Sequence, residues 1–249
     1  MNGRALVTGA SRRVGRAVAL ALAARGWHLV LTTRGRAEDL AATAAEARRA
    51  GAPSVEMELL DAADAAALGA FCGRRADEAW DLLVHNASCY RSDEPVGRAD
   101  PARDLRRAVE DFTVNAAAPW IMTRALAPAL ARSRRPGGGS VVALGDVHAS
   151  GPAVRGFGAY LMSKAALHQA VRSLAAELAP AVRVNAVLPG VVAWPDGTPE
   201  PERERYLSRV PLGRSGTPED AAGAVVWLGL EATYLTGVLL PVDGGRLLR

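Results

Sequence analysis

Lysine is almost absent from this chain of 249 residues: Lys164 is the only one, and arginine supplies every other strong base. Cysteine is scarce as well. Cys72 and Cys89 have neither the number nor the spacing of a disulfide framework or a zinc site. No run of about 18 apolar residues occurs, so the sequence predicts no membrane-spanning helix. A strand is expected almost at once after the first residue, which leaves no room for a signal peptide. We therefore expect a cytoplasmic protein.

Aromatic residues make up only 5% of the chain, and they do not alternate with basic blocks. This matters because the net charge of +4 and the pI of 9.6 raise nucleic acid as a partner. The arginines are scattered, however, and many lie near acidic residues, as in Arg103-Asp104. The pattern favours a solvated basic surface, and we expect no nucleic-acid partner and no membrane partner.

Short β-rich apolar segments alternate with alanine-rich segments along the whole chain. This alternation predicts an α/β fold, a single-domain doubly wound parallel sheet (Rossmann fold) spanning residues 1–249. The expected strands are Arg4–Thr8, His28–Thr33, Ser54–Leu60, Asp81–Asn86, Ser140–Leu144, Val182–Leu188 and Val238–Val242. The expected helices are Val14–Arg25, Glu38–Ala50, Asp64–Glu78, Pro101–Ser133, Gly158–Ala179 and Pro218–Leu230.

Residues 191–210 interrupt this rhythm with Pro195, Pro199 and Pro201. In doubly wound folds, the ligand crevice lies beyond the carboxyl ends of the strands, and loops there often cover it. We expect this segment to form a flap that covers a substrate.

The single lysine lies four residues after a tyrosine, in Tyr160-Leu161-Met162-Ser163-Lys164. Residues i and i+4 share one face of a helix, so both side chains are expected to point the same way. A nearby ammonium group favours phenolate over phenol, which lowers the pKa of a tyrosine. The spacing therefore makes Tyr160 a candidate proton donor or acceptor near neutral pH. The alternative is an ordinary helix face on which a tyrosine and a lysine meet by chance.

A glycine-rich turn, Thr8-Gly9-Ala10-Ser11-Arg12-Arg13-Val14-Gly15, follows the first strand and begins the first helix. Gly9 allows a tight turn and Gly15 allows the helix to approach the strand. The helix N-terminus then presents N–H groups to a pyrophosphate. Arg13 is expected either to lie over these phosphates and reach a polar substrate, or to point away as a surface side chain.

The second strand ends in Thr33-Arg34-Gly35-Arg36, without an acidic residue. NAD-specific folds usually have an acid here for the ribose hydroxyls, whereas basic residues suit a 2′-phosphate. Arg34 and Arg36 therefore favour NADP(H) as the cofactor.

The turn, the YxxxK pair and further motifs resemble the short-chain dehydrogenase/reductase family. These motifs follow in order along nearly the whole chain: His85–Ser88, Val114–Ala116, Pro189-Gly190, Pro211–Arg214, Thr217–Asp220, Tyr234–Gly237 and Val242–Gly245. The resemblance implies a cofactor site formed by Gly9, Ser11, Arg12, Arg13, Val14, Arg34, Arg36, Asp61, Asn86, Ala87, Ser88, Tyr160, Lys164, Pro189 and Gly190. Asp61 would bind the adenine amino group.

Two departures narrow the resemblance. Asp146 stands where the family has a catalytic serine, and NNAG is replaced by Asn86-Ala87-Ser88, followed closely by Tyr90. With Arg13 in the glycine-rich turn, these features are similar to the pteridine reductase and dihydromonapterin (dihydrofolate) reductase branch. The segment from Asp146 to Tyr160 is one residue longer than usual there, and the threonine that follows Pro-Gly in the family is missing.

This resemblance implies catalytic roles for Asp146, Tyr160, Lys164 and Asn115. Pterin contacts are expected from Arg13, Ser88, Tyr90, Asp146, Tyr160 and Trp194, with Tyr90 stacking on the ring. The alternatives are that Asp146 caps a turn, Tyr90 packs in the core and Trp194 forms a dimer contact. The four histidines show no metal-ligand grouping, so no metal is expected, and only His148, two residues from Asp146, merits attention.

The leading hypothesis is an NADPH-dependent reductase that acts on pterin, dihydropterin or dihydrofolate. The nearest rival is an NADPH-dependent carbonyl or ketoacyl reductase of the same family, which Asp146 in place of serine argues against. A nucleotide-sensing binding protein is a third hypothesis, but such a protein need not keep Tyr160, Lys164 and Asn115. Apolar C-terminal segments such as Val225–Leu228 suit a homo-oligomer, with a tetramer as the family expectation.

Overall fold

The computed structural model describes residues 3–98, 100–151, 154–195 and 197–249. Within them, seven strands form one sheet in which every pair is parallel, in the order β3-β2-β1-β4-β5-β6-β7. The strands are β1 (Arg4–Val7), β2 (His28–Thr33), β3 (Val55–Leu59), β4 (Leu82–His85), β5 (Gly139–Leu144), β6 (Val182–Pro189) and β7 (Leu239–Val242). The predicted doubly wound parallel sheet is confirmed.

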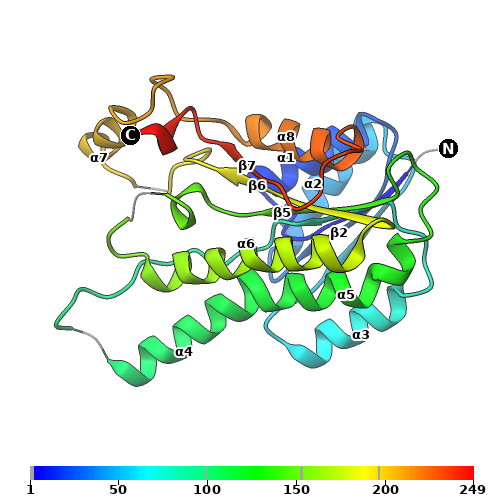
Figure 1. The fold of residues 1–249 in the computed structure, drawn as a ribbon, viewed down its shortest axis with the longest axis horizontal. Coiled ribbons are helices and arrows are strands. Elements are labelled where there is room, and N and C mark those ends of the chain that lie inside the picture. The colour runs from blue at the N-terminus through cyan, green and yellow to red at the C-terminus, as the bar shows by residue number, and fades with distance from the viewer. Residues whose placement is uncertain (1–2, 99, 152–153, 196) are drawn as a thin grey trace.

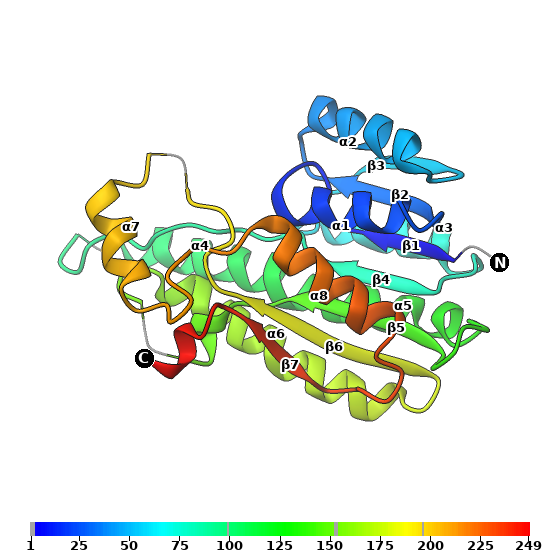
Figure 2. The same cartoon turned by 90° about the horizontal axis from the view of Figure 1, so that it is seen from above.

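Helices cover both faces of the sheet (Figures 1 and 2). One face carries α1 (Arg13–Ala23), α2 (Ala37–Ala50) and α8 (Pro218–Leu230), and the other carries α3 (Ala65–Arg75), α4 (Pro101–Phe112), α5 (Ala118–Leu130) and α6 (Gly158–Leu178). Each layer encloses its own apolar core against the sheet. The strands β4 and β5 are buried along their whole length, which explains why their sequences are apolar without alternation.

Several helices begin where a side chain accepts hydrogen bonds from the first turn. Asp64 accepts from Ala66 and Ala67 at the start of α3, and Asp100 does the same for α4. At α8, Thr217 and Asp220 form a reciprocal capping box. Such caps contribute about 1 kcal/mol each, so the start points of these helices follow from local sequence.

The expected helix Pro101–Ser133 is not a regular α-helix throughout. Its middle is a π-helical segment, η1 (Thr113–Ala117), in which the Ala118 amide donates to the Thr113 carbonyl five residues back. Pro119 has no N–H for the carbonyl of Asn115, and its ring would clash with that carbonyl in an α-helix. The local widening accommodates the proline, and π segments of this kind are frequent at functional sites.

Two further differences concern shorter elements. The expected flap, residues 191–210, contains a helix, α7 (Glu200–Leu207), which projects from the body of the fold in both views (Figures 1 and 2). Short 3₁₀ segments occur at η2 (Val147–Ala149) and η3 (Arg246–Leu248). In the part of the chain that the structure describes, no helix is both long and apolar enough to cross a membrane.

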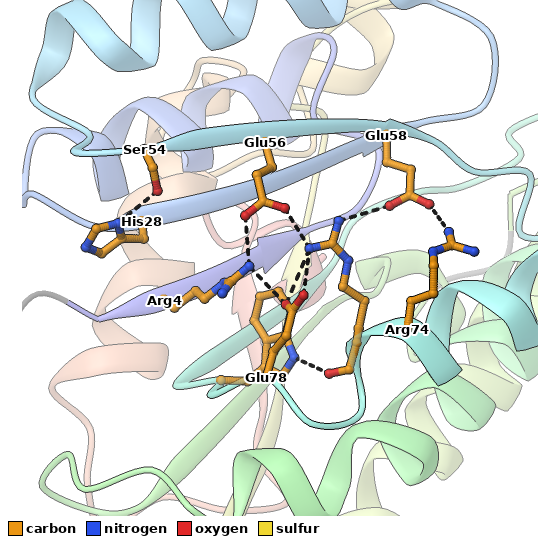
Figure 3. A network of polar contacts seen from close by, with 9 residues as sticks. Arg4, His28, Ser54, Glu56, Glu58, Arg74 and Glu78 are labelled. Atoms are coloured by element: carbon orange, nitrogen blue, oxygen red, sulfur yellow. Dashed lines mark hydrogen bonds and ion pairs between the residues drawn. The ribbon is translucent and has the colours of Figure 1, made fainter.

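A network of ion pairs ties the edge strand β3 to α3 and β1 (Figure 3). Arg75, with a side chain that is 11% exposed, contacts Glu56, Glu58 and Glu78. Arg74 also pairs with Glu58, but its side chain is 58% exposed. Charged side chains on an edge strand discourage pairing with another chain, so the network both anchors and protects β3.

We predict that Arg75→Leu lowers the free energy of unfolding by about 1.5–3 kcal/mol, because three carboxylates lose a shielded charged hydrogen-bond donor. Arg74→Leu is the matched control, and we expect a loss of about 0–1 kcal/mol for this exposed pair. Chemical denaturation at low and high salt measures both. Equal losses for the two variants would contradict the shielded role of Arg75.

Candidate active site

A cleft of about 910 Å³ opens at the carboxyl ends of the strands. Its walls come from the segments that follow β1 to β6. The chain winds in opposite directions on either side of the β1–β4 pair, which is where ligands bind in open α/β sheets. Most predicted site residues line this cleft: Gly9, Ser11, Arg12, Arg13, Val14, Arg34, Arg36, Asp61, Asn86, Ala87, Ser88, Tyr90, Asp146, Tyr160, Lys164, Pro189 and Gly190.

The glycine-rich turn is held against the loop after β4. Gly9 has a left-handed backbone (φ 65°), and a Cβ atom there would lie 2.8 Å from the Cα of Ala87. The Asn86 side chain donates to the carbonyls of Thr8 (3.0 Å) and Gly9 (2.8 Å). A Cβ on Gly15 would collide with the Gly9 carbonyl. The predicted reasons for both glycines are therefore confirmed. Arg12, the N-cap residue of α1, makes no side-chain cap hydrogen bond to that helix.

Asp146 uses its two carboxylate oxygens for two different contacts. Oδ1 accepts the backbone N–H of His148 at 2.8 Å, and Oδ2 accepts the Tyr160 hydroxyl at 2.9 Å. The alternative that Asp146 caps a turn is thus correct, but it does not exclude the contact with Tyr160. Burial alone raises the pKa of Asp146. Hydrogen bonds from His148 and Tyr160 outweigh burial and hold that pKa below its ordinary value, so the carboxyl group is ionised at neutral pH.

The expectation that Lys164 lowers the pKa of Tyr160 is wrong in this structure. Burial, followed by the Asp146 charge, raises the pKa of Tyr160 well above its ordinary value. Both side chains lie on α6, but the ammonium of Lys164 donates to the Leu144 carbonyl (2.7 Å) and lies 5.8 Å from the phenol ring centroid. Burial lowers the pKa of Lys164 to about 8. The hydroxyl of Tyr160 therefore keeps its proton.

Asn115 lies behind the cleft and is 1% exposed. Its Oδ1 accepts from the Ser88 hydroxyl (3.0 Å) and the Cys89 amide (2.8 Å). Its Nδ2 donates to the Cys89 carbonyl (3.0 Å) and the Ser163 hydroxyl (2.9 Å). Through these contacts Asn115 joins the loop after β4 to helix α6, which carries Tyr160 and Lys164. Its expected catalytic role stays a prediction.

Tyr90 lies at the cleft and is not a core residue, being 50% exposed. Its ring stacks on Phe157 (centroids 4.9 Å apart) and meets Tyr160 edge-on (4.9 Å). Nearby, Asp93 accepts hydrogen bonds from the amides of Gly158 and Ala159. Asp93 thereby caps α6, whose own N-cap residue makes no side-chain cap. No local sequence pattern pointed to Phe157 or Asp93, because their partners lie far away along the chain. Phe157 contacts Tyr90, and Asp93 contacts the start of α6.

Arg34 and Arg36 both line the cleft beside the end of β2, and each has an acidic neighbour. Arg34 pairs with Glu110 at 3.4 Å and Arg36 with Asp39 at 3.2 Å. Both arginine side chains are more than half exposed. Exposed pairs contribute about 0–1 kcal/mol, whereas a charged hydrogen bond to phosphate contributes about 1.5–3 kcal/mol. A bound phosphate would therefore displace these partners.

Trp194 is not among the described residues that line the cleft. Its ring packs edge-on against Tyr206 of α7 (5.5 Å), with Arg203 over its face (5.7 Å). The Tyr206 hydroxyl accepts a hydrogen bond from the Val191 amide at 3.2 Å. Tyr206 therefore joins helix α7 to Val191 and Trp194, which precede that helix in the chain. A substrate contact from Trp194 stays a prediction. Within the described residues, no group of three or more potential metal ligands lies together.

Comparisons with known proteins match a stretch of the chain that includes all the described residues lining the cleft. The family model described as enoyl-(acyl carrier protein) reductase matches residues 9–246. The Streptomyces violaceoruber protein named as ketoacyl reductase 2 of the granaticin polyketide synthase is 37% identical over 250 residues, covering 97% of this chain and 94% of that protein. Pteridine reductase 1 of Leishmania tarentolae is 34% identical over 275 residues, covering 97% and 95%. The chain belongs to the short-chain dehydrogenase/reductase family.

A solved structure agrees with this membership. The Beutenbergia cavernae structure, named for an NAD(P) dependent gluconate 5-dehydrogenase with bound NADP at low occupancy, has a TM-score of 0.88 at 31% identity. It covers 99% of this chain and 97% of that chain. The protein is thus an NAD(P)-dependent oxidoreductase of the short-chain family. Its relatives differ in the substrates they are named for, so the substrate must be inferred from the site itself.

Arg13 stands where the short-chain dehydrogenase/reductase family usually has a glycine, and its backbone shows why glycine is common there. Its φ of 48° makes it the only described non-glycine residue in the left-handed region. That conformation costs an L-residue about 1–2 kcal/mol. Such strain is characteristic of functional sites, and the exposed side chain lines the cleft.

We predict that Arg13→Gly raises the free energy of unfolding by about 1 kcal/mol, because the relief of strain exceeds the added entropy of an unfolded glycine. The neighbouring Arg12→Gly is the control. Arg12 has an extended backbone (φ −160°), so this change relieves no strain and should lower stability, by about 0.5–1 kcal/mol from the added chain entropy and further through the lost side-chain interaction. Denaturation curves give both values, and a loss in both variants would show that Arg13 is not strained.

Proposed function

We propose that this protein is an NADPH-dependent pteridine reductase, which reduces a C=N bond of a pterin, dihydropterin or dihydrofolate. The observation that carries the proposal is the hydrogen bond from Tyr160 to Asp146, 2.9 Å long. In the family pattern a serine occupies the position of Asp146. A serine hydroxyl donates to the oxygen that develops charge in a carbonyl substrate. A carboxylate accepts instead, and this suits a ring that presents N–H groups.

The site fits a dinucleotide on three grounds. Gly9 holds the turn after β1 in a left-handed conformation, the N-terminus of α1 lies at the cleft, and Arg34 and Arg36 offer positive charge at the end of β2. In the proposal, residues 9–14 hold the pyrophosphate, and Asp61 and the two arginines hold the adenosine end. Asn86, Pro189 and Gly190 border the nicotinamide.

NADPH, when bound, supplies the hydride to a ring carbon. Tyr160 donates a proton to the adjacent ring nitrogen, and its raised pKa means that the hydroxyl carries this proton at neutral pH. Lys164, buried on the same helix, holds the nicotinamide ribose. Asp146 accepts substrate N–H groups. Tyr90 stacks on the pterin through the ring face opposite Phe157, and Arg13 and Ser88 contact its polar edge.

A ketoacyl or other carbonyl reductase is the second candidate. The observation that favours it is the 37% identity to the Streptomyces protein named as a ketoacyl reductase, compared with 34% to pteridine reductase 1. The two sequence identities differ by only three percentage points. The carboxylate of Asp146 in place of a serine hydroxyl, by contrast, changes the chemistry at the reacting centre. We therefore place the pteridine first.

We predict that Asp146→Ser lowers kcat for dihydropterins by about 10²–10⁴, the usual scale of general acid catalysis, because the proton donor Tyr160 and the substrate N–H groups lose their acceptor. Serine caps a turn nearly as well as aspartate, so the fold and NADPH binding should be preserved. Initial rates with pterins, dihydrofolate and simple ketones measure the effect, with Asp146→Asn as a variant of the same shape. Wild-type dihydropterin turnover in the serine variant would contradict the proposed pteridine mechanism and would favour a carbonyl reductase.

We predict a wide preference for NADPH over NADH, and a loss of that preference by about tenfold or more in Arg34→Ala, because a charged contact with the 2′-phosphate is removed. Arg49→Ala, an exposed change near the far end of α2, is the control and should leave the preference unchanged. The measurement is kcat/KM for each cofactor. Equal efficiency with NADH in the unmodified protein would refute the assignment.

We also propose that the protein forms homo-oligomers, with the tetramer of its family as the expected state. The observation that supports this is a set of exposed apolar side chains along α4 and α5: Leu105, Val109, Phe112, Trp120 and Ile121. Isolated exposed apolar residues are normal, but a row of them along neighbouring helices is typical of an interface.

A further inference from the structure

His148 lies in η2, two residues after Asp146, and its side chain is only 10% exposed. Its Nδ1 is 3.0 Å from Oδ1 of Asp146, the oxygen that also accepts the His148 amide. The other carboxylate oxygen accepts the Tyr160 hydroxyl. One carboxylate thus joins His148 to Tyr160. Because an ionised carboxylate can only accept, Nδ1 of His148 carries the proton of this hydrogen bond.

The ring of His148 lines the cleft and packs against the flap helix α7. Tyr206 of α7 packs against it at 5.8 Å between centroids. Nε2 of His148 is buried and has no hydrogen-bond partner among the described residues. Leaving a buried polar atom unpaired is unfavourable. An apolar side chain would fill this space without that penalty, so the presence of histidine here requires a reason. Among the described residues, the hydrogen-bond partner of its ring is Asp146.

Helix α6 also holds the turn that carries His148, through the ring of His168. The Asp146 amide donates to Nε2 of His168 on α6 at 3.4 Å, and Nδ1 of His168 contacts the Ser150 hydroxyl at 2.9 Å. Burial, and then the charge of Lys164, lower the pKa of His168 to about 4. His168 is therefore neutral and supports the backbone of the turn, whereas His148 alone contacts the carboxylate with a ring nitrogen.

We propose that His148 is a positioning residue of the reaction, which holds the Asp146 carboxylate ionised and turned toward Tyr160. This inference rests on the proposed function in that Tyr160 is the proton donor. It extends the pair of Asp146 and Tyr160 to a chain of three side chains.

The charges around Asp146 support this role. Burial is the largest influence on its pKa and raises it, and the ring of His148 is the largest influence that lowers it. Tyr90 and Tyr160 also face the carboxylate, as do Lys164, His168 and Tyr206 from α6 and α7. When the ring is removed, burial meets less opposition, so the pKa of Asp146 rises and the carboxylate is protonated at a higher pH.

The test compares His148→Asn with His148→Leu, two side chains of the same shape. Asparagine places an amide N–H near the position of Nδ1, whereas leucine has no donor. We measure kcat from about pH 3 to about pH 8 with NADPH and a dihydropterin, so that the range extends below the ordinary pKa of an aspartate. The asparagine variant should keep the wild-type profile. In the leucine variant, the loss of activity at acid pH should begin about one pH unit higher, the shift that corresponds to a tenfold change in protonation.

Controls separate positioning from folding. The affinity for NADPH, measured by fluorescence, should be unchanged in both variants. His148→Gln, whose amide lies near the position of Nε2, is a second loss variant and should behave like leucine. In an Asp146→Asn background, His148→Leu should cause no further shift. A wild-type profile in the leucine and glutamine variants, or an asparagine variant that behaves like leucine, would overturn the proposal.

The same profiles measured with an activated ketone distinguish this inference from the proposed function. If the wild type reduces the ketone and no pterin, the pteridine assignment fails. His148 is then judged on the ketone profiles, because Tyr160 is the proton donor for either substrate. If the wild type reduces pterins and all profiles coincide, the pteridine assignment stands and the role of His148 is refuted.

Discussion

The parallel sheet changes its winding direction between β1 and β4, and every feature of the site depends on that reversal. Parallel strands need crossover helices, and these helices cover both faces of the sheet, so the carboxyl ends of the strands are the natural place for a cleft. The loops after β1 and β4 diverge there. The hydrogen bonds from Asn86 to Thr8 and Gly9 close the base of the gap, and the remaining loops place their side chains around it.

Within the cleft, one carboxylate organises the reacting groups. Asp146 stays ionised although it is largely buried, because its two oxygens accept separate hydrogen bonds from the η2 turn and from Tyr160. Its negative charge in turn helps to keep the proton on Tyr160. Lys164 and Asn115 complete the arrangement, one as a buried cation and the other as a link between the loop after β4 and α6.

Much of this arrangement could be predicted because it depends on short-range patterns. The YxxxK spacing placed Tyr160 and Lys164 on one helix, and the glycine spacing identified the turn after β1. The absence of an acid after Thr33 was visible without a structure. The π-helical segment escaped prediction, although Pro119 is its local cause, because alanine-rich sequence around it favours an ordinary helix. Helix α7 was missed because three prolines suggested an irregular flap.

The sequence by itself determined the strand and helix order and the glycine-rich turn, since each follows from spacing within a few residues. The resemblance of its motifs to a known family implied most residues around the cleft. The tertiary structure decided the charge states. Whether Tyr160 is acidic depends on how deeply it is buried and on the nearby Asp146, and both are set by packing between elements far apart in the chain. The same holds for Asp93 at the start of α6 and for His148 under Tyr206: long-range contacts, invisible in local sequence, give these side chains their partners.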